Sequence, residues 1–213
     1  MTTQIDRRPI SDAAMLRAAL ARLSVVSDAT WAAIQPSIRS KSVAAGEHLL
    51  DAGEIARRVY FVSQGLFREY YVDHHGREAT RRFCTAGEMT GSLADLLSGG
   101  PSMCSIEAIH DGEVLHLPWQ EIDALGRVNS EWNMLMRRLA EVLFLRKVKR
   151  EFEMLTLSAS ERHRLFESEY PEVRHRIPRR LVASYLGITP VHLSRVSVSE
   201  TSKRAAAGQK RKT

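Results

Sequence analysis

Basic and hydroxyl side chains cluster near the C-terminus in a pattern that suits contacts with an anionic polymer. The stretch over 177–196 reads IPRRLVASYLGITPVHLSRV. The Arg195 guanidinium can donate two parallel hydrogen bonds to a guanine edge or grip a phosphate. Arg179 and Arg180 suit contacts with a phosphate backbone, and Thr189, with the unpaired amides at the start of a helix, suits an anion. The chemistry that these residue types indicate is recognition of double-stranded DNA.

Two short helices joined by a tight turn would place these side chains on one surface. Pro178 opens the first helix, Gly187 ends it, and Pro190 fills the first turn of the second. Such a helix-turn-helix enters the major groove of DNA with its second helix. The apolar positions that would pack the pair are Leu181, Val182, Ala183, Tyr185, Leu186, Ile188, Leu193 and Val196. The positions left to face solvent are Thr189, Val191, His192, Ser194 and Arg195.

A pair of helices that only packs a core, with its charges facing water, is the alternative interpretation. The distribution of charge favours the DNA interpretation. Residues 1–129 hold 13 Lys and Arg against 16 Asp and Glu, whereas residues 130–213 hold 18 against 9, in a chain of net charge +6. An acidic first part joined to a basic second part indicates that the second part alone meets a polyanion.

The middle of the chain has the pattern of a small antiparallel sheet. From 42 to 117, short runs rich in β-branched and aromatic residues alternate with turn residues. We expect turns at the six breaks, 52–54, 63–65, 73–76, 86–88, 98–101 and 111–112. The helices expected around it are 12–23, capped by Ser11 or Asp12, then 28–35, 118–125 and 160–168, capped by Ser160. The predicted fold class is α+β, with an antiparallel β-roll or jelly-roll domain over 1–128, a long helix over 129–157 and an all-α helix-turn-helix domain over 158–213.

The long helix begins at Asn129 or Ser130 and runs to Leu155. Its apolar residues recur at steps of three and four over about 38 Å, which is more than so small a domain can bury. We expect this stripe to pair with a second copy of the chain by knobs-into-holes packing. The alternative is a helix that lies along its own sheet domain. The residues of the stripe are Leu135, Leu139, Val142, Leu145, Val148, Phe152 and Leu155.

The composition excludes several classes of protein. No apolar run approaches the ~18–20 residues of a membrane helix, and the N-terminal residues lack the apolar segment of a secretory signal. Cys84 and Cys104 are the only cysteines, too few for a disulfide scaffold or a four-thiolate cluster. We expect a cytoplasmic protein with no membrane partner, whose two thiols are buried as small hydrophobic groups.

Four segments together resemble one protein family. LGITPVHLSR, at 186–195, resembles the recognition motif of the Crp/Fnr family of bacterial transcription regulators. AGEHLLDAGEIARRVYFVSQGLFREYYVDHHGRE, at 45–78, resembles the family's cyclic-nucleotide-binding-like β-roll. AGEMTGSLADL, at 86–96, resembles the segment that closes the ligand pocket, and EVLHLPWQEIDAL, at 113–125, resembles the strand and helix that lead into the dimer helix. The resemblance implies a homodimer with a β-roll sensor and a domain that binds a two-fold symmetric DNA operator.

The positions that would hold a cyclic nucleotide depart from the family pattern. In members that bind one, a Gly-Glu pair holds the ribose and an Arg-Ser or Arg-Thr pair holds the phosphate. Gly91 matches the glycine, but Ser92, followed by Leu93, replaces the glutamate, and Ser102 and Met103 align with the Arg-Ser pair. The missing arginine removes charge-assisted hydrogen bonds worth ~1.5–3 kcal/mol each. We therefore expect no cofactor in this pocket and no tight binding of cAMP or cGMP.

Two C-terminal segments also depart from the family pattern. Pro190 and Val191 stand where activators carry an Arg-Glu pair, so the operator should differ from the TGTGA-type half-site that this pair reads. Beyond Val196, a basic tail either adds salt-dependent DNA affinity or has no role. Its charged residues are Lys203, Arg204, Lys210, Arg211 and Lys212.

Two other functions stay open. A metal-dependent enzyme on a jelly roll would need converging ligands, whereas His48, His110 and His116 are scattered and the His74–His75 pair suits an exposed turn. We expect neither a metal site nor enzymatic activity. The second alternative is a β-roll sensor that acts through a protein partner. For a DNA-binding regulator, RNA polymerase and an unidentified small-molecule effector are the further candidate partners.

Overall fold

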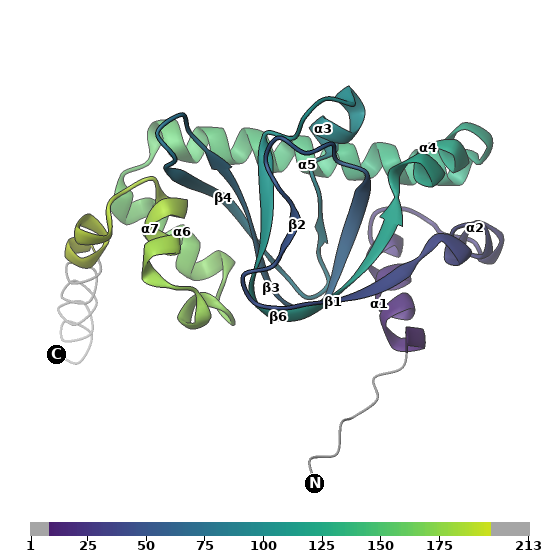
Figure 1. Ribbon diagram of the computed structural model, residues 1–213, viewed down its shortest axis with the longest axis horizontal. Helices are drawn as coiled ribbons and strands as arrows, with labels where there is room; N and C mark the ends of the chain where they lie inside the picture. Colours follow the sequence, from purple (N-terminus) through teal and green to yellow (C-terminus); the bar gives the residue numbers. More distant parts are fainter. Residues whose placement is uncertain (1–8, 197–213) are drawn as a thin grey trace, which may run out of the picture. The chain divides into compact units, whose positions relative to one another are not determined.

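The structure, a computed structural model, describes residues 9–196 (Figure 1). These residues form two compact units. The first comprises residues 9–72 and 81–144 and contains most of the sheet, and the second comprises residues 73–80 and 145–196 and contains the C-terminal helices. The predicted α+β class, with an antiparallel roll and C-terminal helices, is confirmed.

Two N-terminal helices and a 3₁₀ turn precede the sheet: α1 (Pro9–Ala21), α2 (Asp28–Ile34) and η1 (Gln35–Ser37). The caps predicted for α1 are wrong, because the helix begins at Pro9 and contains Ser11 and Asp12 in its first turn. Proline suits the first position of a helix, where its missing N–H would have no partner. The cap of α2 is Ser27, whose hydroxyl accepts a hydrogen bond from the Thr30 amide at 3.2 Å.

The sheet has six strands, with a short helix between the last two: β1 (Arg39–Val43), β2 (His48–Leu50), β3 (Arg58–Val72), β4 (Glu78–Thr85), β5 (Met89–Thr90), α3 (Leu93–Ser98) and β6 (Cys104–Pro118). The strand order is β1-β6-β3-β4, with β2 paired to β6 and β5 paired to β3. β6 runs antiparallel to β1, β2 and β3. Because successive residues of a strand point to opposite faces, the central pair β3 and β6 contributes to both buried apolar clusters of the roll.

The turns predicted at 63–65 and 111–112 are wrong, because both breaks lie inside continuous strands. β3 and β6 each run for 15 residues, and their pairing shifts register around Gly65. Gly112 faces this shift so closely that a Cβ atom on it would lie 2.4 Å from the Gln64 carbonyl oxygen. The two glycines allow the paired strands to bend together without a hairpin.

We expect Gly112→Ala to lower the free energy of unfolding by about 1–3 kcal/mol, the usual cost of overpacking a close contact. The added methyl group would overlap backbone atoms that can move only by disturbing the β3–β6 pairing. Urea denaturation measures the difference. Gly100→Ala is the matched control, because the nearest atom to its Cβ would be the Ser98 Oγ at an ordinary 3.7 Å. Equal stabilities of the two variants would contradict this explanation.

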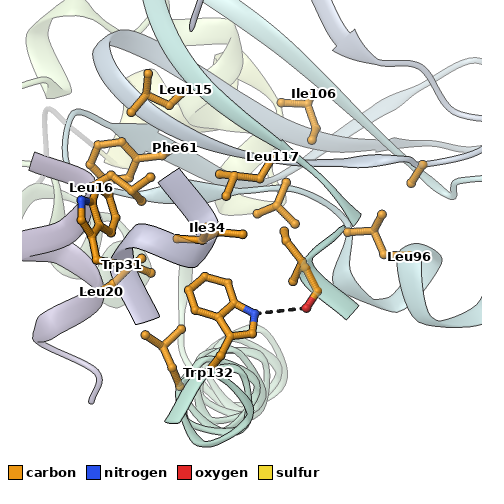
Figure 2. Packing of buried hydrophobic residues seen from close by; sticks show 14 of the residues in the cluster. Leu16, Leu20, Trp31, Ile34, Phe61, Leu96, Ile106, Leu115, Leu117 and Trp132 are labelled. Atoms are coloured by element: carbon orange, nitrogen blue, oxygen red, sulfur yellow. Dashed lines mark hydrogen bonds between the residues drawn. The ribbon is translucent and has the colours of Figure 1, made fainter. Parts of the chain in front are cut away.

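One apolar core joins the N-terminal helices, the roll and the start of the long helix (Figure 2). The indole N–H of Trp132 donates a hydrogen bond to the Ile122 carbonyl oxygen at 3.1 Å, so the polar atom of this buried ring is satisfied. Other members of the core are Leu16, Leu20, Trp31, Ile34, Phe61, Leu96, Ile106, Leu115, Leu117 and Leu135.

The long helix is continuous, as the spacing of its apolar residues predicts. After α4 (Trp119–Val128), α5 (Ser130–Thr156) extends over 27 residues, or about 40 Å. Glu131 in its first turn accepts hydrogen bonds from the backbone amide and the hydroxyl of Ser27, at 3.0 and 2.6 Å. These two bonds fix the start of α5 to the start of α2. Within residues 9–196, no helix is both long and apolar enough to cross a bilayer.

The second unit contains α6 (Ala159–Glu169), a 3₁₀ turn η2 (Arg174–Arg176) and α7 (Arg179–Leu186), and the chain is helical again over 190–196. The predicted Ser160 cap of α6 is wrong. The Ser158 hydroxyl accepts a hydrogen bond from the Glu161 amide, and the Glu161 carboxylate accepts one from the Ser158 amide. This reciprocal capping box leaves the Ser160 side chain outside the cap.

The tip of the hairpin between β3 and β4, residues 73–80, belongs to this second unit. Ser184 of α7 contacts it twice. The Ser184 hydroxyl accepts a hydrogen bond from the Thr80 amide at 2.8 Å and donates one to the Glu78 carbonyl oxygen at 2.9 Å. At the tip itself, His74 and His75 are exposed, as the sequence predicts for turn histidines.

Candidate nucleic-acid interface

Gly187 makes the turn between α7 and the helix over 190–196. Its φ of 66° lies in the left-handed region that other residues rarely adopt, and its amide donates to the carbonyl oxygens of Ala183 and Ser184. The Ile188 amide also donates a hydrogen bond to the Ala183 carbonyl oxygen, at 3.0 Å. The chain therefore leaves α7 and enters the next helix within three residues.

The two helices pack through the apolar residues that the sequence indicates. The small Ala183 is fully buried, and Ile188 is half-buried beside the turn. The remaining positions of the pattern are all buried: Leu181, Val182, Tyr185, Leu186, Leu193 and Val196. The packing of a helix-turn-helix is therefore present, and it fixes which side of the second helix faces outward.

An aromatic cluster holds α7 in the second unit. The Tyr185 ring lies 5.7 Å from the Phe166 ring and 5.8 Å from the Tyr170 ring, measured between centroids. The Arg150 guanidinium lies 4.0 Å from the centre of the Tyr185 ring, and the Tyr185 hydroxyl donates to a Glu169 carboxylate oxygen at 3.0 Å. Burial raises the pKa of the Tyr185 phenol, so this hydroxyl remains a donor at neutral pH.

The outward side of the second helix carries the predicted recognition residues, and all of them are exposed. Thr189, Val191, His192 and Arg195 line one hollow of about 480 Å³, together with Ser160 and Val196. The Thr189 hydroxyl accepts a hydrogen bond from the His192 amide at 3.2 Å, which caps the helix beside the hollow. The structure thus brings four of the seven predicted residues into one concave surface.

The other three predicted residues, Ser194, Arg179 and Arg180, are exposed but lie outside the described lining of this hollow. The Ser194 hydroxyl donates to the Pro190 carbonyl oxygen of its own helix at 3.1 Å and lies 3.5 Å from an Arg179 guanidinium nitrogen. Arg179 is therefore held beside the second helix, where a basic group can meet a phosphate that flanks the groove.

Ser160 also lines the hollow, although the sequence does not indicate it as an interface residue. It lies in the first turn of α6, close to the recognition residues of another helix. Amides and hydroxyls in the first turn of a helix suit an anion. The signal that could identify it is the Ser158–Glu161 pair, because this capping box moves the helix start and leaves the Ser160 hydroxyl free of a capping role.

Burial divides the predicted apolar stripe of α5. Leu135 lies in the core of the first unit and Leu139 is also buried, so neither can face a second copy of the chain, which corrects the single stripe predicted from the sequence. Val142 is half-buried, whereas Leu145, Val148 and Phe152 are exposed. The reason is the spacing. Three successive steps of three residues from position 139 to position 148 turn the stripe by about 180° around the helix axis.

A buried carboxylate is hydrogen-bonded to Ser102 and Met103, the two positions that align with the phosphate-binding pair of cyclic-nucleotide-binding relatives. Asp95 of α3 is 2% exposed, and its Oδ2 accepts hydrogen bonds from the Ser102 hydroxyl at 2.6 Å and from the Met103 amide at 3.2 Å. The remaining positions of this predicted pocket are one buried and two half-buried residues: Ser92, Gly91 and Leu93. The Ser102 hydroxyl and the Met103 amide, which could otherwise meet a phosphate, are thus already paired.

A second buried carboxylate lies in the roll beside β5. Glu69 is 1% exposed, and its Oε1 accepts a hydrogen bond from the Thr90 hydroxyl at 2.8 Å. The Glu69 carboxylate also forms ion pairs with Arg81 and Arg82, at 3.3 and 3.6 Å, and Arg82 pairs with Glu88 at 3.0 Å. The sequence gives no sign of this cluster, because charged residues of a strand are expected to face solvent.

The cysteines and histidines of the roll are not gathered into a ligand set. Within residues 9–196, no three or more His, Cys, Asp or Glu side chains converge as metal ligands do. Cys84 and Cys104 are both buried, as predicted, and burial raises the pKa of each thiol, that of Cys104 to about 12. Both therefore remain protonated near neutral pH. The predicted basic tail, Lys203 to Lys212, lies outside the described residues.

Residues 40–129 match the family model of the cyclic nucleotide-binding domain. This match covers the roll from β1 to the end of α4. No curated protein sequence matches the chain.

Three solved structures are similar to this chain in fold. FixK2 from Bradyrhizobium japonicum is 22% identical, with a TM-score of 0.67, over 78% of this chain and 85% of that one. A transcriptional regulator assigned to the Crp/Fnr family, from Eubacterium rectale, is 16% identical, with a TM-score of 0.69, over 84% and 85%. The c-di-GMP-responsive global regulator CLP from Xanthomonas campestris is 13% identical, with a TM-score of 0.66, over 83% and 93%. At these identities the likeness is one of fold.

Proposed function

The chain contains a cyclic nucleotide-binding domain and has the fold of Crp/Fnr-family regulators, and from this premise we propose that it is a dimeric transcription regulator that binds DNA sequence-specifically. The observation that carries the proposal is the hollow over which Thr189, Val191, His192 and Arg195 are exposed on one helix. Hydroxyl, imidazole and guanidinium groups can donate hydrogen bonds to acceptor atoms of base edges and phosphates. Helices that only packed a core would not need these groups together on their outer surface.

In-vitro DNA selection with the purified full chain tests the proposal. At about physiological salt, where non-specific contacts are weakened, we expect one enriched motif with two-fold symmetry. Its half-sites should lie ~34 Å apart, one turn of the duplex, because each recognition helix enters the major groove on the same side of the DNA. The absence of any enriched motif would contradict DNA recognition and favour a sensor that acts through a protein partner.

The exposed part of the α5 stripe supports dimer formation. Leu145, Val148, Phe152 and Leu155 are large, apolar and exposed, and they follow steps of three, four and three residues. This spacing places them on one face, as in the a and d positions of a coiled coil. We name these four residues the exposed stripe. Pairing two copies of α5 along it would remove the apolar side chains from water and relate two recognition helices by a two-fold axis.

We further propose that the roll binds no cyclic nucleotide. The Asp95 carboxylate accepts hydrogen bonds from the Ser102 hydroxyl and the Met103 amide. A phosphate that entered here would have to displace this carboxylate and would be repelled by its negative charge. A side chain that could neutralise both anions, such as the arginine of cyclic-nucleotide-binding relatives, is replaced by Ser102. Arg81 and Arg82 do not replace the missing arginine, because both already form ion pairs with the carboxylates of Glu69 and Glu88.

Calorimetric titration with cAMP and with cGMP should therefore show no binding tighter than about 1 mM, since each missing charge-assisted bond costs ~1.5–3 kcal/mol. Asp95→Asn is the matched variant: it removes the negative charge and nearly keeps the shape. We expect its affinity for either nucleotide to stay weak, because the arginine is still absent. A micromolar Kd for the unaltered protein would contradict the proposal for the roll and leave the DNA proposal in place.

An effector of another chemistry, RNA polymerase as a partner and a cytoplasmic location remain predictions. The effector can be sought in the same DNA selection by adding cell metabolites. A change in the enriched motif or in the affinity would then identify a mixture that contains one.

A further inference from the structure

Val191 is an apolar side chain in an otherwise polar surface. It is 65% exposed, although it lies in the hollow with Thr189, His192 and Arg195. The hollow has a second valine in its described lining, Val196, but that residue is buried and packs the helix. Among these lining residues, Val191 alone is both apolar and exposed. A surface that only gripped phosphates would gain nothing from this side chain.

The major groove offers one apolar group to such a side chain, the 5-methyl group of thymine. Phosphates and the other base edges present charges, donors or acceptors, none of which a valine can satisfy. A β-branched side chain on a helix is also held in one rotamer, so its methyl groups are fixed before binding. We infer that Val191 contacts a thymine methyl group and so selects thymine at one position of each half-site. The inference rests on the proposed DNA-binding function.

The position of this thymine follows from helix geometry. Val191 and Arg195 are four residues apart and project from the same face, about 5–6 Å from each other. Base pairs stack about 3.4 Å apart. The thymine should therefore lie one or two base-pair steps from the base or phosphate that Arg195 contacts. Val191 also follows Pro190 in the first turn of its helix, the part of a recognition helix that approaches base edges.

Replacing thymine by uracil in the selected operator tests the inference, because this change removes the methyl group and nothing else. For the unaltered protein, we expect Kd to rise about fourfold at one thymine of a half-site and about 15-fold when both half-sites are changed, as for the loss of one and two buried methyl groups. For Val191→Ala, the same replacement should change Kd by less than about twofold, since the contact is already absent.

His192→Ala is the matched control, because it alters the same hollow and keeps the valine. We expect this variant to retain the sensitivity to uracil, whatever its own affinity. If the unaltered protein binds every uracil-substituted operator as tightly as the parent, or if Val191→Ala keeps the full loss, the inference is overturned while DNA recognition stands. A selection that enriches no motif would overturn the proposed function and this inference with it.

Discussion

Leu145→Asp should convert the proposed dimer to a monomer and lower the affinity for the selected operator by more than about 100-fold. Leu145 is 64% exposed and begins the exposed stripe of α5. In a two-fold pair of α5 helices, the substitution places two carboxylates in an apolar seam, where they lose water and repel each other. A monomer can contact one half-site only, so it loses the ~10²- to 10⁴-fold gain that a linked second contact provides.

Sedimentation velocity measures the dimer, and fluorescence anisotropy of a labelled operator measures Kd. Leu97→Asp is the matched control, because Leu97 lies in α3 and is 68% exposed. We expect this control to change neither the mass nor the affinity. If Leu145→Asp still sediments as a dimer and binds the operator normally, the subunit interface lies elsewhere.

Arg195→Ala should weaken specific binding by ~1–3 kcal/mol in each half-site and leave the fold intact. Arg195 is exposed at the hollow, whereas the neighbouring residues that pack the helix, Leu193 and Val196, are buried and unchanged. We therefore expect an unaltered melting temperature and a large loss of affinity for the selected operator. Because a dimer presents the residue twice, the losses in the two half-sites should add.

Arg22→Ala is the control for this variant: Arg22 is exposed and lies in the first unit. The salt dependence of binding separates two roles of Arg195. Loss of a base contact should relax the preference at one position of the motif, whereas loss of a phosphate contact should weaken all sequences equally and lower the salt slope by about one. Full affinity of Arg195→Ala for the operator would show that this residue takes no part.

The end of α7 and the length of α5 could be predicted from the sequence because they depend on neighbouring residues, whereas the starts of α1 and α6 could not. Gly187 ends α7, and the recurrence of apolar residues gives α5 nearly its full length. At Gly65 and Gly112, by contrast, the neighbouring residues do not determine the local structure. Glycine marks a turn and a bend within a strand equally well, and only the partner strand distinguishes them. In this chain, each of these two positions requires glycine because the backbone at the other position comes too close to leave room for a Cβ atom.

Burial is harder to predict than secondary structure. Steps of three and four residues identify α5 as a helix, but they do not tell which side of it meets the roll. The spacing therefore groups Leu139 with Val148, although the two residues face opposite ways. Glu69 and Asp95 illustrate the same limit for charges. Their burial depends on donors from distant segments, and sequence neighbours give no sign of those partners.

The recognition surface could be predicted in part because it is what remains once the buried positions are assigned. The apolar pattern of the two helices leaves Thr189, Val191, His192 and Arg195 outside, and the structure gathers these four residues at one hollow. Ser160 could not be predicted in the same way, since it comes from α6 and its role depends on where a different helix begins.

The close approach of Gly65 and Gly112 also limits how the sheet can misfold. Sliding one strand past its neighbour by two residues keeps the alternation of inward and outward side chains, so it is usually the misalignment that costs least. Here such a slide would set a residue that carries a Cβ atom against the Gly112 backbone, where a Cβ atom even on Gly65 would lie only 2.7 Å from the Gly112 Cα. The two bends coincide in a single alignment, and this favours the native pairing of β3 and β6 over a shifted one.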